Sequence, residues 1–349
     1  MPRRLSLLLK VWEYSVKSCA CGFFLFLGIN IMATYKEEVI PDIVRDALLV
    51  DQRGEEGDRM FEYSATRLCT SPRQLQLERR HSSEQDAPCL KDIWYTFAGH
   101  AMHDFLENRL KNNPRYLVEK RIIRFDKPLG GKEEDYRRVG AKFDAYDKET
   151  KTLSDHKTTT TYVYGKEMKE EWINQLMINA YFLEKEGYPV DKVAINAIYM
   201  DWRDSKLKYA KEGEYPPAPC TTFEMPCWSM EDREYLYKSL LKAHIEAESI
   251  PDDQLPYCPR EYCWESGESF AVYRVGASKA IKLCATEQEA KDYIKSKNLT
   301  GDIRIEHRPP TRRRCSDYCS AAPFCNQYKE WYAKLIKSSQ DGTDDSSNK

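Results

Sequence analysis

The stretch that decides the fold reads Gly140-Ala141-Lys142-Phe143-Asp144, then a polar turn, then Ser154-Asp155-His156-Lys157. Both ends of this stretch have the pattern of β-strands, and the polar turn between them predicts a hairpin. Successive side chains of a strand point to opposite faces, so Asp155 and Lys157 share one face and His156 points to the other. We expect Asp144, at the end of the first strand, to reach the same place across the hairpin.

These polar residues suit the binding of a hard divalent cation. Mg²⁺ and Mn²⁺ prefer oxygen ligands and leave positions open for water and phosphate. We expect such ligands from the carboxylates of Asp144 and Asp155 and from the backbone carbonyl of His156. Lys157 would orient an attacking water or stabilise charge in the transition state. His103, on an earlier predicted helix, would add an imidazole that favours Mn²⁺ over Mg²⁺.

The composition bounds the class of protein. The chain has 349 residues, 41% of them hydrophobic, which suits one large globular domain or two ordinary ones. Its 54 lysines and arginines nearly balance its 56 aspartates and glutamates, so the overall charge does not indicate a nucleic-acid-binding protein. Any DNA contact would come from local clusters, which taken alone are more often solvated faces. The clusters are Arg79-Arg80-His81, Arg137-Arg138 and Arg312-Arg313-Arg314.

Residues 1–36 form an N-terminal extension that superficially resembles a signal sequence. Its first apolar run is broken by Lys10, and its second, from Cys19 to Met32, is too short to span a bilayer comfortably. No small-x-small cleavage site follows the second run. We therefore expect a cytoplasmic protein without membrane association. A start assigned too early, with Met32 as the true initiator, explains the extension at least as well as targeting does.

Hydrophobic periodicity predicts an α/β fold with a mixed central sheet flanked by helices. Apolar residues recur at helical spacing in 92–110 and 168–186, and 193–200 reads as a buried strand. A smaller unit of two strands, a helix and a strand follows within 269–307. The expected organisation is an extension (1–36), a core (37–250), a small mixed unit with clustered cysteines (251–335) and a disordered tail (336–349).

Three of the twelve cysteines lie close together near the C-terminus, at Cys315, Cys319 and Cys325. This spacing lets one short segment hold a soft metal centre, while a fourth ligand comes from elsewhere in the chain. In a reducing compartment, clustered thiols indicate metal ligands rather than disulfides. The candidates for the fourth ligand are Cys258, Cys69 and Cys89.

The order of these motifs resembles the PD-(D/E)XK nuclease superfamily, in its RecB-like branch, and within it the phage-type exonucleases. The resemblance covers roughly Ser64 to Tyr328 and implies a restriction-endonuclease-like core. One departure is that the glycine usually found three residues before the aspartate is Ala141, with Gly140 beside it. The resemblance implies metal ligands at His103, Asp144, Asp155 and His156, and catalytic residues at Lys157, Gln175 and Tyr181.

The C-terminal cysteines resemble those of iron–sulfur RecB-like nucleases, which carry three such thiols and one distant cysteine. In many members the distant cysteine precedes the nuclease motifs near a Pro-Arg pair, which favours Cys69. The phage-type arrangement instead matches Cys258-Pro259-Arg260, so we expect Cys258 to be the fourth ligand. The implied cofactor is a structural 4Fe-4S cluster, with zinc as the second choice, held by Cys258, Cys315, Cys319 and Cys325. The expected bystanders are Cys220, Cys227, Cys263 and Cys284.

These features together predict a metal-dependent DNA nuclease, in particular an exonuclease acting on single strands or duplex ends. Tyr162 and Tyr164, after the hairpin, would stack on unpaired bases. Recombination or replication proteins are the expected partners. Two alternatives from other classes stay open: a catalytically inactive nucleic-acid-binding protein on the same scaffold, and a redox iron–sulfur protein. A nuclease of the CRISPR-adaptation type is a close relative that this chain alone does not exclude.

Overall fold

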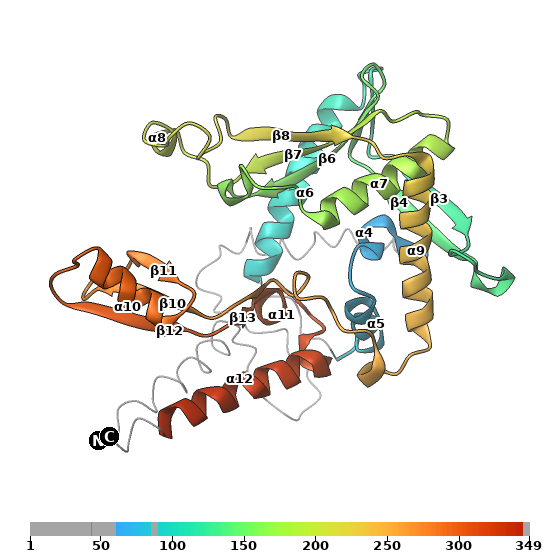
Figure 1. The fold of residues 1–349 in the computed structure, drawn as a ribbon. Helices are drawn as coiled ribbons and strands as arrows, with labels where there is room; N and C mark the ends of the chain where they lie inside the picture. The colour runs from blue at the N-terminus through green and yellow to red at the C-terminus, as the bar shows by residue number, and fades with distance from the viewer. Residues whose placement is uncertain (1–42, 44–60, 85–89, 345–349) are drawn as a thin grey trace. The chain divides into compact units, whose positions relative to one another are not determined.

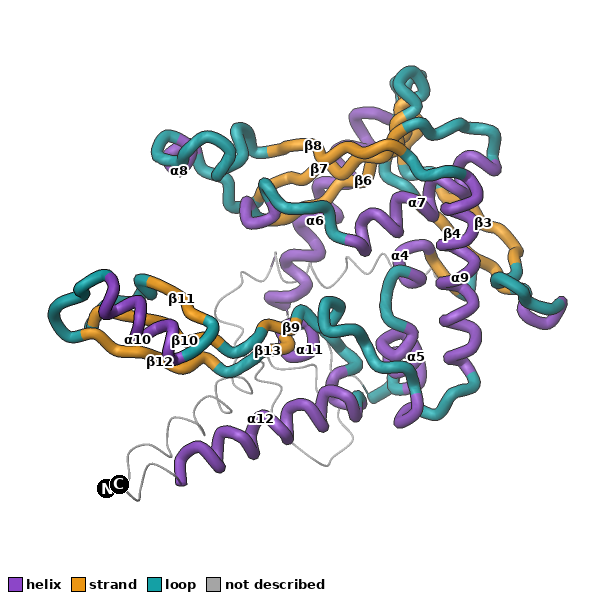
Figure 2. Tube along the Cα trace, in the orientation of Figure 1, coloured by secondary structure: helices purple, strands orange, loops and turns teal. Residues whose placement is uncertain are grey.

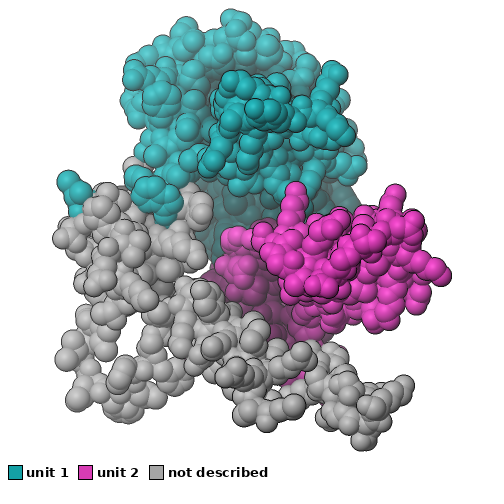
Figure 3. Space-filling model, turned by 90° about the vertical axis from the view of Figure 1, so that its left-hand side faces the viewer, with its two compact units in different colours: residues 1–70, 86–245 teal, residues 71–85, 246–349 magenta. Residues whose placement is uncertain are grey.

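The computed structural model of this chain describes residues 43, 61–84 and 90–344. The chain divides into two compact units, shown in teal and magenta in Figure 3. Unit 1 comprises residues 1–70 and 86–245, and unit 2 comprises residues 71–85 and 246–349. The predicted extension, residues 1–36, lies outside the described residues, as does Cys89. Among the described helices, none combines the length and the apolar character needed to cross a membrane.

Unit 1 carries the hairpin and the elements around it (Figure 1). Its helices are α4 (Ala65–Leu68), α6 (Leu90–Leu110), α7 (Glu170–Lys185), α8 (Asp204–Leu207) and most of α9 (Met230–Glu248). Its strands are β1 (Tyr63–Ser64), β2 (Tyr116–Val118), β3 (Arg121–Asp126), β4 (Arg137–Lys142), β5 (Ala145–Asp147), β6 (Thr152–Thr159), β7 (Lys192–Tyr199) and β8 (Cys220–Pro226).

The strands of unit 1 form two mixed sheets. The larger has the order β2-β5-β6-β7-β8, in which β6 and β7 are parallel and the other neighbours are antiparallel. Figure 2 shows β6, β7 and β8 of this sheet next to one another. The smaller has the order β1-β4-β3, in which β1 is parallel and β3 antiparallel to β4. Helices α6 and α7 contact β6. The predicted α/β class, with mixed sheet flanked by helices, is confirmed.

The parallel pairing of β6 and β7 requires a crossover connection, and α7 supplies it. The helix and the following strand are fixed by apolar burial, as their sequence patterns predicted. The buried residues are Leu176, Met177, Ala180 and Leu183 in α7, and Val193, Ala194, Ile195 and Ala197 in β7. Because this core holds α7 in place, the residues at the start of the helix have a defined position beside β6.

The chain passes from the smaller sheet to the larger one at Phe143 and Asp144. The first strand of the predicted hairpin is therefore two strands, β4 and β5, separated by these two residues. Phe143 is buried and anchors the crossing point in the core. Asp144 lies just outside both ladders, where its carboxylate is available to side chains and to the backbone of β6.

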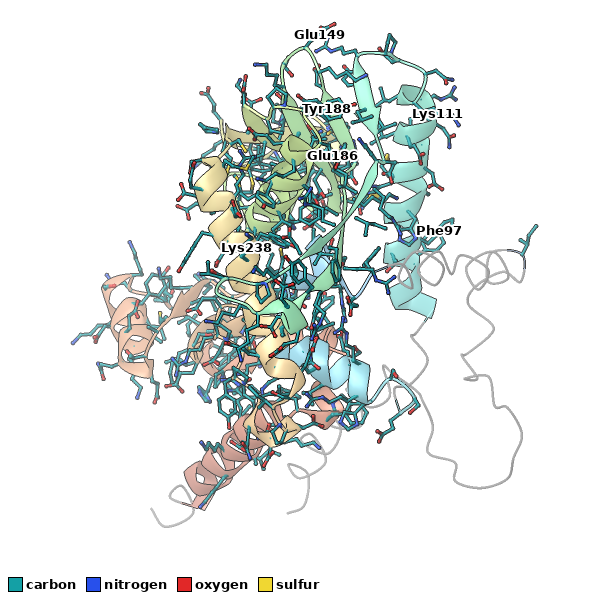
Figure 4. The ribbon with its side chains drawn as sticks, turned by 90° about the vertical axis from the view of Figure 1, so that its right-hand side faces the viewer. Phe97, Lys111, Glu149, Glu186, Tyr188 and Lys238 are labelled. Atoms are coloured by element: carbon teal, nitrogen blue, oxygen red, sulfur yellow. The ribbon has the colours of Figure 1, made fainter. Side chains whose placement is uncertain are left out.

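Strands β5 and β6 form the predicted hairpin. Ala145 pairs with Ser154, and Asp147 pairs with Thr152. Figure 4 shows Glu149 in the turn of this hairpin. The short ladder ends at Ala145, so the following part of β6 has no backbone partner on that side from β5. This is the part of the strand that carries the acid-x-lysine triplet.

Unit 2 contains the predicted strand–strand–helix–strand unit, formed by β10 (Ser269–Arg274), β11 (Lys282–Cys284), α10 (Glu287–Ser296) and β12 (Ile303–Arg308). Its sheet has the order β11-β10-β12 and is antiparallel. The remaining elements are α5 (Pro72–Arg80), β9 (Glu265–Ser266), β13 (Thr311–Arg312), α11 (Arg313–Asp317) and α12 (Asn326–Asp344).

Two predicted boundaries need correction. Helix α5, assigned to the core at 37–250, belongs to unit 2, because Leu77 is buried with Leu255 and Cys325. The tail expected at 336–349 is instead helical as far as Asp344, the last residue of α12. Apolar residues at Tyr328, Trp331 and Leu335 continue at helical spacing and explain why the helix extends so far.

Candidate functional site

Side chains from three separate elements of unit 1 converge beside the hairpin. His103 lies on α6, Glu119 follows β2, and Asp144 lies between β4 and β5. One donor atom from each lies within 4.8 Å of the other two, and all three residues are half-buried. His103 Nδ1 is 3.2 Å from Asp144 Oδ1 and 3.8 Å from Glu119 Oε1. We call these residues the His–Glu–Asp triad; an imidazole and two carboxylates at this spacing can ligate one divalent cation.

Glu119 is the member of the triad that the sequence did not reveal. It sits in the left-handed region, with φ 49°, a conformation uncommon for residues other than glycine. Its backbone N–H donates to the Asp144 carbonyl at 3.0 Å, and its carboxylate pairs with Lys142. Its only sequence signal is an acid at a strand boundary, which is common. The uncommon backbone turns this carboxylate towards His103.

The carboxylate of Asp144 is held at both oxygens. Oδ1 faces His103, and Oδ2 accepts a hydrogen bond of 2.6 Å from the backbone N–H of His156. This N–H lies beyond the end of the β5–β6 ladder, so the aspartate side chain replaces the missing backbone acceptor. It is thus the His156 N–H that faces Asp144. The predicted ligation by the His156 carbonyl has no counterpart among the contacts described.

Asp155, Lys157 and Gln175 form a second group, which we call the Asp–Lys–Gln cluster. Gln175 Nε2 donates to Asp155 Oδ1 at 3.0 Å, and Lys157 Nζ donates to Gln175 Oε1 at 3.2 Å. Lys157 Nζ also lies 2.7 Å from Asp155 Oδ2, as an ion pair without hydrogen-bond alignment. Asp155 is only 2% exposed, so this oxygen is a buried acceptor with unused capacity. Such an atom suits a nearby cation.

The triad and the cluster lie on either side of the His156 peptide. The ring of His156 points towards α6, with its centroid 6.0 Å from that of His103. Asp155 and Lys157 alternate with it and face Gln175 on α7. Asp155 is therefore not a member of the triad, although the sequence placed it in the same ligand set. Asp144 connects the two groups through its hydrogen bond to His156.

The charges of the site are strongly coupled. The nearby carboxylates of Asp144 and Glu119 raise the pKa of His103 to about 10. Burial alone would raise the pKa of Asp144, but its contacts with His103 and the His156 N–H outweigh burial and lower it. Burial raises the pKa of Asp155 to about 6, against the opposing charge of Lys157, and burial lowers the pKa of His156. The positive charge of protonated His103 thus compensates the negative charges of Asp144 and Glu119. A divalent cation bound at the triad would displace this proton and provide the compensating charge instead.

Helix α6 approaches β6 closely at the position of Gly99. A Cβ atom at Gly99 would lie 3.3 Å from Thr158 Oγ1, so glycine lets the helix pack against the strand next to Lys157. His103 is one helical turn further along α6 and faces the same side. The Gly99-x-x-x-His103 spacing therefore has a structural role, because it sets the distance of the imidazole from Asp144.

Tyr181, predicted to be catalytic, lies in the core and not in the site. It is 2% exposed, and its ring is 5.4 Å from that of Tyr237. It lies six residues after Gln175, so helical geometry turns the two side chains to different faces of α7. Asn179 is also buried, where its Nδ2 donates to the Lys142 carbonyl at 3.3 Å.

The four predicted cluster ligands gather in unit 2. Cys258, Cys315, Cys319 and Cys325 all line one cavity, although the first lies far from the other three in sequence. Cys325 immediately precedes α12, and Cys315 lies on α11. Burial raises the pKa of Cys319 to about 12, so its thiol holds a proton that a soft metal would displace. Cys69 lies in unit 1, where its Sγ donates to the Ala65 carbonyl at 3.2 Å.

A fifth thiol, Cys263, lines the same cavity and was not predicted to take part. It is 1% exposed, and its Sγ donates to the Cys258 carbonyl at 3.9 Å. It lies five positions after Cys258, so one short loop carries both thiols to the cavity. The Cys258…Cys263 spacing was the available sequence signal, but it carries little information without the fold.

Arg73 supplies a buried positive charge at the cavity. It is 1% exposed, and Nη1 donates to Cys325 Sγ at 3.8 Å and to Asn326 Oδ1 at 2.5 Å. Its other bonds reach the carbonyls of Pro256 and Leu255. Within the described ranges these partners include no carboxylate, and a buried charge without a counter-charge is costly. Thiolates bound to a metal centre would supply that counter-charge, so the residues fit such a centre.

Comparison with known proteins adds little to this picture. No protein-family model matches the chain, and no curated protein matches it. A solved structure described as the crystal structure of SSO0001 aligns with 51% of this chain and 74% of its own, at 16% sequence identity and a TM-score of 0.36. A likeness at this level carries no argument about fold or function. The superfamily resemblance seen in the motifs stays a prediction.

Proposed function

We propose that this protein is a metal-dependent DNA nuclease, acting as an exonuclease of the PD-(D/E)XK type. The observation that carries the proposal is the convergence of the His–Glu–Asp triad with the Asp–Lys–Gln cluster across a single peptide, at His156. The first group offers ligands for a hard cation. The second offers a lysine held beside a buried carboxylate. Phosphodiester hydrolysis needs both functions close together.

His103, Glu119 and Asp144 would hold Mg²⁺ or Mn²⁺, and Asp155 would add an acceptor from the neighbouring group. The bound ion would supply charge neutralisation at the phosphate and lower the pKa of water. Gln175 fixes the Lys157 ammonium through its Oε1 and the Asp155 carboxylate through its Nε2. Lys157 can then orient an attacking water or donate to a phosphate oxygen as negative charge develops.

The loop after β6 supports a single-stranded substrate. Tyr162 lies five residues after Lys157 and is 76% exposed, and Lys166 Nζ lies 2.8 Å from the centre of its ring. The exposed ring of Tyr162 could stack on an unpaired base, while the ammonium of Lys166 could contact the adjacent phosphate. Arg80, part of a predicted basic cluster, instead binds Asp252 and three backbone carbonyls. DNA binding by this protein would thus depend on the loop after β6 more than on Arg80.

The cysteine-lined cavity would hold a 4Fe-4S cluster, with zinc as the second choice, and its role would be structural. Arg73 would balance the negative charge of the thiolates. A cytoplasmic location fits this proposal, since reducing conditions keep thiols available as ligands. Recombination or replication proteins are the partners we expect for an enzyme that resects DNA ends.

The direct test is digestion of end-labelled single-stranded and duplex DNA in Mn²⁺, comparing the wild type with Lys157→Ala. We expect loss of cutting in the variant with DNA binding, measured by fluorescence anisotropy, largely retained. Lys151→Ala is a matched control, because Lys151 immediately precedes β6, the strand that carries Lys157, and its side chain is 45% exposed and pairs with Asp191. The control should cut like the wild type.

The alternatives give different outcomes. Equal cutting by Lys157→Ala would remove Lys157 from the mechanism. Metal-dependent DNA binding without cutting by the wild type would favour an inactive nucleic-acid-binding protein. Visible absorption that bleaches with dithionite, in a chain without nuclease activity, would favour a redox protein.

A further inference from the structure

The cavity in unit 2 presents more thiols than one metal centre uses. A 4Fe-4S cluster or a tetrahedral zinc ion takes four cysteine ligands. Five cysteines line this cavity: Cys258, Cys263, Cys315, Cys319 and Cys325. Cys315, Cys319 and Cys325 come from one C-terminal segment, so the surplus lies between the two cysteines of the 258–263 loop.

Cys258 is tied to the chain just after Cys325. Gln327 Oε1 accepts from the Cys258 N–H at 2.8 Å, and Gln327 Nε2 donates to the Cys258 carbonyl at 2.8 Å. The Cys258 thiol donates to Ser71 Oγ at 3.1 Å. Both the backbone and the thiol of Cys258 are thus positioned at the cavity wall by buried polar side chains.

Cys263 is tied to the chain just before Cys315. Its carbonyl accepts from the Arg314 N–H at 3.2 Å, and its own N–H donates to the Pro259 carbonyl at 3.1 Å. Its Sγ donates to the Cys258 carbonyl at 3.9 Å, and its thiol lines the same cavity as those of Cys258 and Cys315. Cys263 is therefore anchored as firmly as Cys258, but beside the opposite end of the three-cysteine segment.

From this arrangement we propose that Cys258 and Cys263 are alternative ligands for the fourth position of the centre, so that either thiol can complete it. The inference rests on the metal centre proposed above. In the exchange, the incoming thiol gives up its proton as its sulfur–metal bond forms. The outgoing thiolate takes up a proton as its bond to the metal breaks, so no electron is transferred. The spare thiol remains within hydrogen-bonding reach, which would slow loss of the centre.

The test measures iron, sulfide and zinc content and visible absorption in full-length chains purified without oxygen. The variants are Cys258→Ser, Cys263→Ser and the double variant, with Cys284→Ser as a control in the β10–β12 sheet, away from this cavity. We expect each single variant to keep at least about half of the wild-type metal and the double variant to lose nearly all of it, because three thiols hold a four-ligand centre poorly. The control should match the wild type.

Serine keeps the volume of the side chain, and circular dichroism of each variant shows whether it has folded. A single variant that folds but loses as much metal as the double variant would overturn the inference while leaving the centre in place. A double variant that keeps its metal would overturn it too, since neither thiol would then be a ligand. A wild-type chain without iron or zinc would overturn the centre and the inference together, whatever the nuclease activity.

Discussion

The side chain of Gln327 holds the backbone of Cys258 at both polar atoms, accepting from its N–H and donating to its carbonyl, each at 2.8 Å. The two residues are 69 positions apart in sequence. Gln327 is 7% exposed, so water cannot easily replace either bond. The Gln327 side chain therefore satisfies both backbone polar groups of Cys258, as a neighbouring strand does in a β-sheet. These two bonds fix the position and orientation of Cys258.

Replacing Gln327 with alanine should destabilise unit 2. The change leaves the Cys258 N–H without its partner and leaves the Cys258 carbonyl only the weak contact from the Cys263 thiol. Unsatisfied groups of this kind cost roughly 1–3 kcal/mol. Urea unfolding, followed by circular dichroism, measures this loss. Gln288→Ala is the matched control, because Gln288 is exposed on α10 and its side chain bonds with Asp292 one turn away; its effect should stay within about 0.5 kcal/mol.

The Gln327→Ala substitution also distinguishes the contributions of Cys258 and Cys263 to metal binding. If either thiol can complete the centre, Gln327→Ala alone should lower metal content little, because Cys263 remains anchored by the Arg314 N–H. Combined with Cys263→Ser, it should lower metal content far more than the two single changes predict. Additive losses would show that Gln327 does not act through Cys258.

Glu119→Gln should weaken Mn²⁺ binding at the triad by about tenfold or more, since the change removes a ligand charge while keeping the side-chain shape. Isothermal titration with Mn²⁺ measures the affinity. Glu186→Gln is a suitable control: it also removes a carboxylate of unit 1, but its partner is Lys120 at 3.9 Å. If Glu119→Gln binds Mn²⁺ as tightly as the wild type, Glu119 is not a ligand.

The sequence was enough to predict those parts of the site that depend on local pattern. Asp155 and Lys157 share a face because a strand alternates, and Gln175 meets them because the crossover helix must return to the parallel neighbour of β6. His103 and Asp144 were also predicted together. The strand pattern places Asp144 at the end of a strand. Gly99 lets α6 pack closely against β6, which brings His103 on the same helix near that strand end.

The rest depends on features that pattern does not encode. Glu119 reaches the site because its backbone is in the left-handed conformation and because the chain passes there from β2 in the larger sheet to β3 in the smaller one. Neither feature has a sequence signature. Tyr181 was misplaced because motif order does not say which face of α7 a residue occupies. Cys263 was missed because its proximity to Cys315 arises from loop packing between segments 52 positions apart.

Gly140→Ala should destabilise unit 1. A Cβ atom at this position would lie 2.6 Å from the ring of Phe61, so the ring must move, at a cost of roughly 1–3 kcal/mol. This contact also explains why glycine stands at 140 rather than at Ala141, whose own Cβ is accommodated in the core. Urea unfolding gives the loss, and Gly267→Ala, where nothing lies within 4 Å of the added atom, should change stability by under about 0.5 kcal/mol.

The contact with Phe61 makes this prediction specific. In a Phe61→Ala background the added methyl meets no ring, so Gly140→Ala should cost less there than in the wild type. An equal cost in both backgrounds would show that the glycine serves the backbone and not the ring.

His81 should titrate above its ordinary pKa of 6.5, because hydrogen bonds from its ring to Asp252 and Glu84 favour the charged form. Its ring also stacks on Phe324 at 4.2 Å, and Arg80 pairs with the same Asp252. Because the folded state binds the proton more tightly, protonated His81 stabilises unit 2. That contribution is complete below the unfolded pKa and is lost as pH rises through the higher folded value.

NMR titration of the His81 ring measures the shift, and Asp252→Asn should bring the pKa of His81 closer to 6.5. A value at or below 6.5 in the wild type would mean that the two carboxylates do not hold the ring in solution.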